Sequence, residues 1–192
     1  MKSRVIKTTL SAIAVLFLAS CNNDDDNQEP EVINEEELIT TVTWVLTAEG
    51  EDPITFTSFD SDGDEGPEEP QITGGTLKAN TTYTGVITVL NATKTPPENI
   101  TEEIEEEDDE HQFFFTPDAG LNISVSYGDK DENDFPVGLE STITTGEAST
   151  GKLAITLLHQ PAKDAEGVAE GDITNAGDDP DFSIRFDVTI EE

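Results

Sequence analysis

Two segments of the chain place oxygen-bearing side chains at every second position, a pattern that can bind calcium. The sets are Asp60, Asp62 and Asp64, and Asp129, Asp131 and Asn133. Ca²⁺ takes about six to eight oxygen ligands, and closely spaced carboxylates in a bent loop can supply several of them. The sequence therefore predicts two weak candidate Ca²⁺ sites, with solvated acidic hairpin loops as the alternative.

Both segments resemble the opening of an EF-hand loop and then depart from it. In the first, Gly66 falls one position late and Gln71 stands where the closing glutamate belongs. In the second, Glu140 is correctly placed, but Asp134 replaces the glycine of the sharp turn. No flanking helices are predicted, so we expect at most an affinity of roughly 0.1–1 mM.

The two histidines form a second constellation. His111 shares strand parity with Phe113 and Phe115, and His159 shares it with the apolar residues of segment 153–157. Each therefore lies at one end of an apolar face. Two imidazoles and a carboxylate could hold Zn²⁺ or another transition metal. The alternative is a pair of rim histidines that hydrogen-bond to backbone or carboxylate groups.

No catalytic constellation can be assembled from the remaining residues. No serine lies in a Gly-x-Ser-x-Gly elbow, and no glycine-rich loop precedes a predicted helix. Carboxylates are so numerous that a glycosidase pair is not distinguishable by sequence. The sequence predicts a protein that is not an enzyme, with a two-carboxylate glycan hydrolase as the remote alternative.

Cys21 is the single cysteine of the chain, and it follows Leu18-Ala19-Ser20. Lys2, Arg4 and Lys7 precede the short apolar run 12–18, which gives the three-part layout of a secretory signal. The arrangement resembles the lipobox of a bacterial lipoprotein. This resemblance implies that residues 1–20 are removed and that Cys21 carries the lipid, whereas an ordinary cleaved signal is the alternative.

The residues after Cys21 bear on location. Asp24-Asp25-Asp26 resembles the surface-export signal of Bacteroidetes lipoproteins, which implies an outer-membrane anchor with the domain at the cell surface. The periplasmic face of that membrane is the alternative. Residues 21–37 have the composition of a disordered acidic tether.

Charge excludes some partners. The chain has 192 residues and a formal net charge of −34. Phosphate binding needs clusters of Lys and Arg, so nucleic acid is not a predicted partner. Cations, basic partners and simple solubility are all compatible with such a charge.

Apolar and polar residues alternate with period two in many segments, as in strands with one buried face. In segment 182–190, apolar residues stand at every even position. Further strands are predicted within 38–46, 53–59, 82–91, 111–116, 121–127, 139–145 and 153–157. Segment 98–110 is the one helical candidate, but its many glutamates should leave it weak or extended. Trp44 is expected in the core, and Phe114 either at a partner surface or buried beneath a loop.

About eight short strands separated by turn residues predict an all-β fold. We expect an antiparallel, immunoglobulin-like β-sandwich over residues 38–192, without a disulfide.

Four motifs are similar to those of small acidic lipoproteins from flavobacteria. They are Ile72-Thr73-Gly74-Gly75-Thr76-Leu77, Asn80-Thr81-Thr82-Tyr83, Asp109-Glu110-His111-Gln112-Phe113-Phe114 and Gly171-Asp172-Ile173-Thr174-Asn175-Ala176-Gly177. Such proteins are often described as having a type 1 periplasmic-binding fold, which has two α/β lobes. The resemblance implies no established activity.

Together these observations predict a lipid-anchored, non-enzymatic binding or accessory protein of the cell envelope. Its expected task is to recruit a cation, such as Ca²⁺ or Zn²⁺, or a small ligand for an outer-membrane receptor. A structural or adhesion spacer is the alternative.

Overall fold

The computed structural model describes residues 38–62, 67 and 69–192. The expected signal peptide over 1–20, Cys21 and the tether over 21–37 lie outside the described residues. Asp64 of the first acidic segment also lies outside them.

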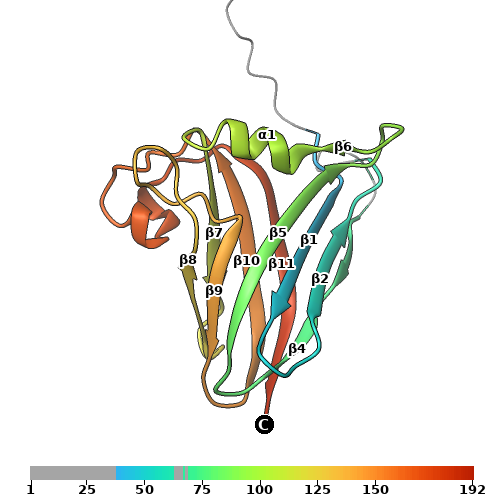
Figure 1. Cartoon of the computed structure of the whole chain (residues 1–192), viewed down its shortest axis with the longest axis vertical. Helices are drawn as coiled ribbons and strands as arrows, with labels where there is room; N and C mark the ends of the chain where they lie inside the picture. The colour runs from blue at the N-terminus through green and yellow to red at the C-terminus, as the bar shows by residue number, and fades with distance from the viewer. Residues whose placement is uncertain (1–37, 63–66, 68) are drawn as a thin grey trace, which may run out of the picture. The chain divides into compact units, whose positions relative to one another are not determined.

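The described residues form two β-sheets that pack face to face, with one short helix across one end (Figure 1). The larger sheet has the order β3-β2-β1-β5-β9-β8, and β6 pairs with β5. Its strands are β1 (Thr41–Thr47), β2 (Ile54–Phe59), β3 (Gln71–Thr73), β5 (Thr82–Asn91), β6 (Glu98–Asn99), β8 (Ile123–Tyr127) and β9 (Glu140–Thr145). All of its pairings are antiparallel.

The smaller sheet has the order β4-β11-β10-β7. Its strands are β4 (Gly75–Lys78), β7 (His111–Pro117), β10 (Ser149–His159) and β11 (Pro180–Glu191). β10 pairs antiparallel with both β7 and β11, whereas β4 runs parallel to β11. The prediction of a β-rich, two-layered fold is therefore confirmed, whereas the expectation of antiparallel pairing throughout was wrong for β4, which pairs with β11 after the chain changes sheet.

The core lies between the two sheets, where the alternating apolar residues meet. Trp44 and Phe56 of the larger sheet lie with ring centroids 5.3 Å apart, and Phe56 meets Phe186 of the smaller sheet edge-on at 5.6 Å. Such aromatic pairs contribute about 0.5–1.5 kcal/mol each beyond the burial of their area. Trp44 is fully buried, as predicted.

Gly85 of β5 makes room for the Trp44 indole. A Cβ atom at position 85 would lie 2.6 Å from Trp44 Nε1 and 2.7 Å from Ile143 Cδ1. Any larger side chain would therefore collide with two core residues. A glycine inside a strand costs backbone entropy, and here the close packing of the indole explains its presence.

All eight predicted strand segments contain a strand, but three further strands were missed. β3, β4 and β6 have only three, four and two residues, too few to establish an alternating pattern. The chain leaves the larger sheet after β3 and enters the smaller sheet at β4. At Gly74 between them, a Cβ atom would lie 2.1 Å from the Asp187 carbonyl oxygen, so only glycine fits this crossing.

The expectation that segment 98–110 is weak or extended was wrong for its first part, because α1 (Ile100–Glu106) is helical. Ile100 and Ile104 lie on one face of α1 and are both buried in the core. Burying an isoleucine contributes about 1.5–3 kcal/mol. A like-charge pair on a helix costs only about 0.2–0.5 kcal/mol, so burial outweighs repulsion between the glutamates.

A long loop with two 3₁₀ turns, η1 (Val168–Glu170) and η2 (Ile173–Asn175), covers part of the outer side of the smaller sheet. Phe114 and Leu158 of that sheet pack with Val168 and Ala176 of the loop in a second, smaller apolar cluster. Phe114 is thus buried beneath a loop, which was one of its two predicted positions. No helix among the described residues has the length and apolar character needed to cross a membrane.

Candidate functional site

The two histidines lie side by side. His111 begins β7, His159 ends β10, and the two residues are direct cross-strand partners. Their imidazole rings stack with centroids 5.0 Å apart and an angle of 4° between the planes. His111 is 0% exposed and His159 7% exposed, so both rings are inside the protein rather than at its rim.

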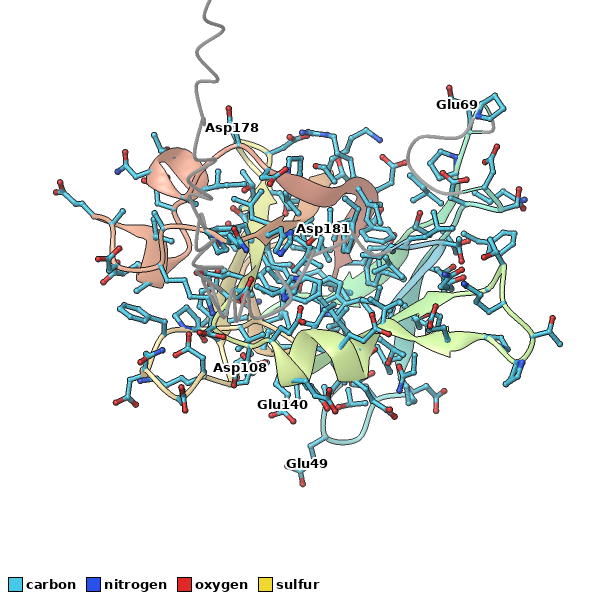
Figure 2. All side chains as sticks on the ribbon, turned by 90° about the horizontal axis from the view of Figure 1, so that it is seen from above. Glu49, Glu69, Asp108, Glu140, Asp178 and Asp181 are labelled. Carbon is cyan, nitrogen blue, oxygen red and sulfur yellow. The ribbon has the colours of Figure 1, made fainter. Side chains whose placement is uncertain are left out.

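A β-bulge brings a buried carboxylate to this pair. The register between β10 and β11 shifts between Leu157 and Leu158, next to Asp181 on β11. A bulge changes the direction of nearby side chains, and the Asp181 side chain is only 1% exposed. Its two oxygens lie 3.8 Å from His111 Nε2 and 4.0 Å from His159 Nδ1. In Figure 2, Asp181 lies toward the middle of the molecule, whereas Glu49, Glu69 and Asp178 lie at its periphery.

The polar groups around the two imidazole rings indicate which ring nitrogens carry a proton. His111 Nδ1 lies 3.1 Å from the carbonyl oxygen of Glu107, just after α1. Since a carbonyl can only accept, Nδ1 carries a proton and Nε2 faces Asp181. That contact is attractive when Nε2 is protonated as well, which makes the ring a cation beside a carboxylate. His159 Nε2 lies 3.8 Å from Glu110 Oε2, which also accepts a hydrogen bond from Gln160.

The stacking of the histidines does not suit a shared metal ion. An imidazole nitrogen binds a metal along a lone pair in the plane of its ring, and two stacked, nearly parallel planes do not meet at one ion. Among the residues that the structure describes, no group of three or more His, Cys, Asp or Glu side chains could hold a metal. The Zn²⁺ prediction for His111 and His159 stays a prediction, whereas the contacts of the pair include a backbone hydrogen bond of His111 and charge contacts of 3.8–4.0 Å with Asp181 and Glu110.

The carboxylates of the second acidic segment accept hydrogen bonds from the chain itself. Asp129 accepts from the backbone amides of Gly138 and Glu140. Asp131 accepts from the amides of Asn133 and Phe135, and it forms a buried ion pair of 2.9 Å with Lys163 Nζ. These two carboxylates close a turn and anchor the 160–177 loop, and the Ca²⁺ prediction for Asp129, Asp131 and Asn133 stays a prediction.

The first acidic segment gives less information. Asp60 Oδ1 accepts a hydrogen bond from the amide of Asp62 at 3.3 Å. With Asp64 outside the described residues, the predicted Ca²⁺ set of Asp60, Asp62 and Asp64 stays a prediction.

The surroundings of Asp131 change its acidity. Burial alone would raise the pKa of this carboxyl, but the hydrogen bonds from Lys163, Phe135 and Asn133 outweigh burial and lower it below its ordinary value. Lys163 also donates to the carbonyl oxygen of Asp108. The pair thus joins the 128–138 loop, the segment after α1 and the 160–177 loop.

A second buried polar contact ties the same loop to β8. Gln112 Nε2 donates to the Val168 carbonyl oxygen at 2.9 Å and to the Tyr127 hydroxyl at 3.2 Å. Tyr127 in turn donates to the Phe113 carbonyl oxygen at 2.7 Å. Burial raises the pKa of Tyr127 to about 12, so its hydroxyl remains a donor at physiological pH.

The outward side of the larger sheet carries a regular array of hydroxyls, which we call the hydroxyl face. Strand parity places these residues outward because Val42, Trp44, Tyr83, Ile87 and Ile143 on the same strands face the core. The hydroxyl face consists of Thr41, Thr43, Thr47, Thr55, Thr57, Thr82, Thr84, Thr88, Ser124, Ser126, Thr142 and Thr144.

Strand register aligns these hydroxyls in rows across the sheet. One row runs through Thr47, Thr84, Thr142 and Ser126 on four successive strands. Others run through Thr57, Thr43 and Thr88, and through Thr82, Thr144 and Ser124. On the described strands β1, β2, β5, β8 and β9, Glu140 is the one charged residue that points outward. The face is therefore almost uncharged in a chain with 43 acidic residues.

The outer side of the smaller sheet has a different character. Lys152 pairs with Asp187 at 2.6 Å, and Arg185 pairs with Asp118 at 2.5 Å. These charged side chains and the 160–177 loop occupy that side. The two faces of the sandwich are thus chemically distinct.

Several hollows adjoin the sheets, and two of them lie beside the hydroxyl face and the core. An open hollow of about 530 Å³ lies at one end of β8 and β9, and it is lined by Asn122, Ser124, Thr144 and their neighbours. The hydroxyl face therefore continues into a concave surface of ligand size. A cavity of about 80 Å³ between the sheets, lined by Ile39, Val42, Phe182 and others, is too small for a typical small-molecule ligand.

Comparison of the chain with models of known protein families, with curated proteins and with solved structures found no match in any of the three.

Three features of the candidate sites were missed in the sequence. Asp181 depends on a bulge that no local pattern marks, and Lys163 depends on a contact between distant loops. The hydroxyl face had a visible signal, because threonines alternate at positions 41 and 43, at 82 and 84, and at 142 and 144. Only the pairing of the strands shows that these threonines form rows.

Replacing Asp181 should destabilise the protein far more than replacing a surface aspartate on the same strand. We expect Asp181→Asn to lower the free energy of unfolding by about 3–5 kcal/mol, since it removes the carboxylate that faces two buried imidazoles. Asp187→Asn, whose carboxylate is 82% exposed, should cost at most about 1 kcal/mol. Urea unfolding at pH 7 measures both, and equal losses would contradict the role given to Asp181.

The Asp131–Lys163 pair should make stability depend on acidity. Because the pKa of Asp131 is lowered in the folded protein, its stabilisation is complete above its unfolded value of about 3.9 and disappears as the pH falls through the lower folded value. We expect Asp131→Asn to be less stable than the natural chain by about 3 kcal/mol at pH 6, with a gap that narrows below about pH 4.

Urea unfolding between pH 3 and pH 7 tests this expectation. Asp134→Asn is the matched control, because Asp134 lies in the same loop with its side chain 91% exposed. A gap between the natural chain and Asp131→Asn that stayed constant down to pH 3 would argue against the ion pair.

Proposed function

We propose that this chain is a lipid-anchored, non-enzymatic binding module of the cell envelope and that the hydroxyl face is its recognition surface. The observation that carries the proposal is the near absence of charge on this face, in a chain whose formal net charge is −34. A surface that served solubility alone would have no reason to keep the acidic residues elsewhere, since charge is what keeps such a protein soluble.

The burial of the histidine cluster supports a binding role over a catalytic one. His111, His159 and Asp181 are the groups best suited to acid–base chemistry, and all three side chains are buried beside the 107–110 segment and the start of β11. A general acid or base must come within hydrogen-bonding reach of its substrate, and a buried cluster does not. We therefore assign this cluster to stability.

The parts of the proposal that concern the lipid anchor and the cellular location are inferred from the sequence. Cys21 would carry the lipid, the tether over 21–37 would hold the domain away from the bilayer, and the outer membrane would display it toward the cell surface. Recruitment for an outer-membrane receptor belongs to the same proposal. A neutral ligand suits it better than a cation, because the carboxylates of Asp129 and Asp131 already accept hydrogen bonds from this chain.

An immunoglobulin-like arrangement of the strands is also part of the proposal. It is supported by the two facing sheets and by the chain that changes sheet between β3 and β4. In such sandwiches, binding surfaces occur both on loops at the ends and on exposed sheet faces.

The anchor can be tested by replacing the lipidated residue. In a Cys21→Ser variant, we expect the protein to lack acyl chains and to leave the membrane fraction, since acyl chains contribute about 0.8 kcal/mol per buried CH₂ group. Mass spectrometry of the N-terminal peptide and fractionation of cell envelopes measure this. A variant that stayed with the membranes would show that something other than Cys21 holds the protein there.

The recognition surface can be tested by removing hydroxyls without adding charge. Thr84 and Thr142 are direct partners at the centre of the hydroxyl face, so a Thr84→Val, Thr142→Val double variant removes two adjacent hydroxyls. We expect the natural chain to enrich a defined component from detergent-solubilised envelopes, and the double variant to capture it at least about fivefold less.

The matched control for that experiment is Thr150→Val, an exposed threonine on β10 of the smaller sheet. It should capture as much as the natural chain. If the natural chain enriched no component, or if the double variant captured as much as the control, the spacer function would be favoured instead.

A further inference from the structure

We propose that the hydroxyl face binds a neutral polysaccharide laid across the larger sheet. This inference rests on the proposed function and names the class of ligand for the same surface. It follows from the charge of the chain, from the chemistry and spacing of the hydroxyls, and from the shape of the surface beside them.

The charge of the protein indicates which class of cell-envelope polymer can bind to the hydroxyl face. An anionic polymer would be repelled by a chain with a net charge of −34. A cationic partner would be drawn to the many carboxylates elsewhere and not to a face where Glu140 stands alone among the outward residues of β1, β2, β5, β8 and β9. A neutral partner is the one for which an uncharged face costs least desolvation.

The hydroxyls suit a partner that is itself rich in hydroxyls. A threonine or serine hydroxyl donates one hydrogen bond and accepts two, so it can pair with a sugar hydroxyl in either direction. The threonine methyl groups and Val86, which is 45% exposed at the middle of the face, offer apolar contact to the C–H groups of a sugar ring. Phe59, the last residue of β2, is 40% exposed and adds an aromatic surface.

The hydroxyls form a regular grid. Neighbouring strands lie about 4.7–4.9 Å apart, and residues two apart on one strand are separated by about 6.5–7 Å. The row Thr47, Thr84, Thr142 and Ser126 therefore presents a hydroxyl at each step across four strands. An extended polymer with repeating hydroxyls can meet several of them at once, and many weak contacts add up on such a partner.

The hydroxyls are only loosely engaged within the protein. Thr47 Oγ1 lies 3.4 Å from the Thr84 carbonyl oxygen, and the Ser124 and Ser126 hydroxyls lie 3.5 Å from the carbonyl oxygens of Thr144 and Thr142. These distances exceed the usual 2.5–3.0 Å or so of a hydroxyl hydrogen bond, so little is lost when a ligand takes over the hydroxyl.

The surface also provides a place for the polymer to continue. Ser124 and Thr144, which end one row of the hydroxyl face, line the open hollow of about 530 Å³ beside β8 and β9. Asn122 lines the same hollow, where its amide nitrogen donates to the Glu147 carbonyl oxygen at 3.0 Å and its amide oxygen can accept from a ligand. Glu147 also lines the hollow. A polysaccharide lying along the row would therefore pass from a flat surface into a concave one.

Native gel electrophoresis tests this proposal with defined polymers. The full-length protein, kept in a neutral detergent, is run through gels that contain mixed-linkage β-glucan, α-mannan or dextran, and through a gel that contains the anionic polymer alginate. We expect at least one of the three neutral polymers to retard the protein and alginate to leave it unretarded. Retardation by none of the neutral polymers would overturn the proposal.

Variants then locate the binding. The Thr84→Val, Thr142→Val double variant should bind the retarding polymer at least about tenfold more weakly, because two hydroxyl contacts are lost. Thr150→Val makes the same uncharged substitution at an exposed position of the smaller sheet. This variant should bind the polymer like the natural chain. Equal weakening by both would place the polymer elsewhere and overturn the proposal.

Together, the capture and gel experiments distinguish a failure of the polysaccharide proposal from a failure of the proposed binding function. If the double variant lost capture of an envelope component while no neutral polymer retarded the natural chain, the hydroxyl face would bind another class of ligand. If neither effect occurred, both the ligand class and the binding function would be wrong.

Discussion

Burial of one apolar face from each sheet is the constraint on which the rest of this structure depends. Trp44 and Phe56 of the larger sheet and Phe186 of the smaller one meet at centroid distances of 5.3–5.6 Å, in a core without a disulfide. Hydrophobic burial is therefore the main term that opposes the self-repulsion of a chain with net charge −34. The alternation of the strands satisfies this constraint and turns every other side chain to the outer side of its sheet, where on the larger sheet its chemistry is not restricted by packing.

At one end of the sandwich, the apolar interface gives way to polar groups. His111, His159 and Asp181 are buried there, and the bulge between β10 and β11 brings the carboxylate to the rings. Burying such groups costs several kcal/mol per charge unless they compensate one another. The cluster therefore adds less net stability than apolar residues would, but it couples the position of the start of β11 to that of the segment after α1. The Asp131–Lys163 pair constrains the 160–177 loop in the same way.

Period-two alternation in the sequence was enough to predict the eight longer strands and the two-layered fold, because each such strand spans several alternations. Alternation could not predict β3, β4 or β6, because these strands are too short to show it. It also could not predict that α1 packs on the core, because this depends on the burial of Ile104. The sequence analysis grouped the two histidines as candidate ligands, but their stacking depends on β7 and β10 being neighbours, which the sequence does not show. Asp131 was chosen for its spacing, whereas its partner Lys163 lies 32 positions away.

The hydroxyl face forms because strand pairing places threonines from separate segments of the sequence side by side. Threonine is common in strands because its branched side chain packs well on a pleated surface, so each threonine alone has an ordinary explanation. Asp and Glu are disfavoured in strands, and threonine pairs across antiparallel strands stabilise a sheet, so these general preferences account for part of the pattern, including Thr82–Thr144 and Thr84–Thr142. The smaller sheet nevertheless carries charge at outward strand positions, since Lys152 lies on β10 and Arg185 and Asp187 lie on β11. General strand preferences apply equally to both sheets, so they do not explain this difference between the two outer faces. The proposed neutral, hydroxyl-rich ligand would explain it.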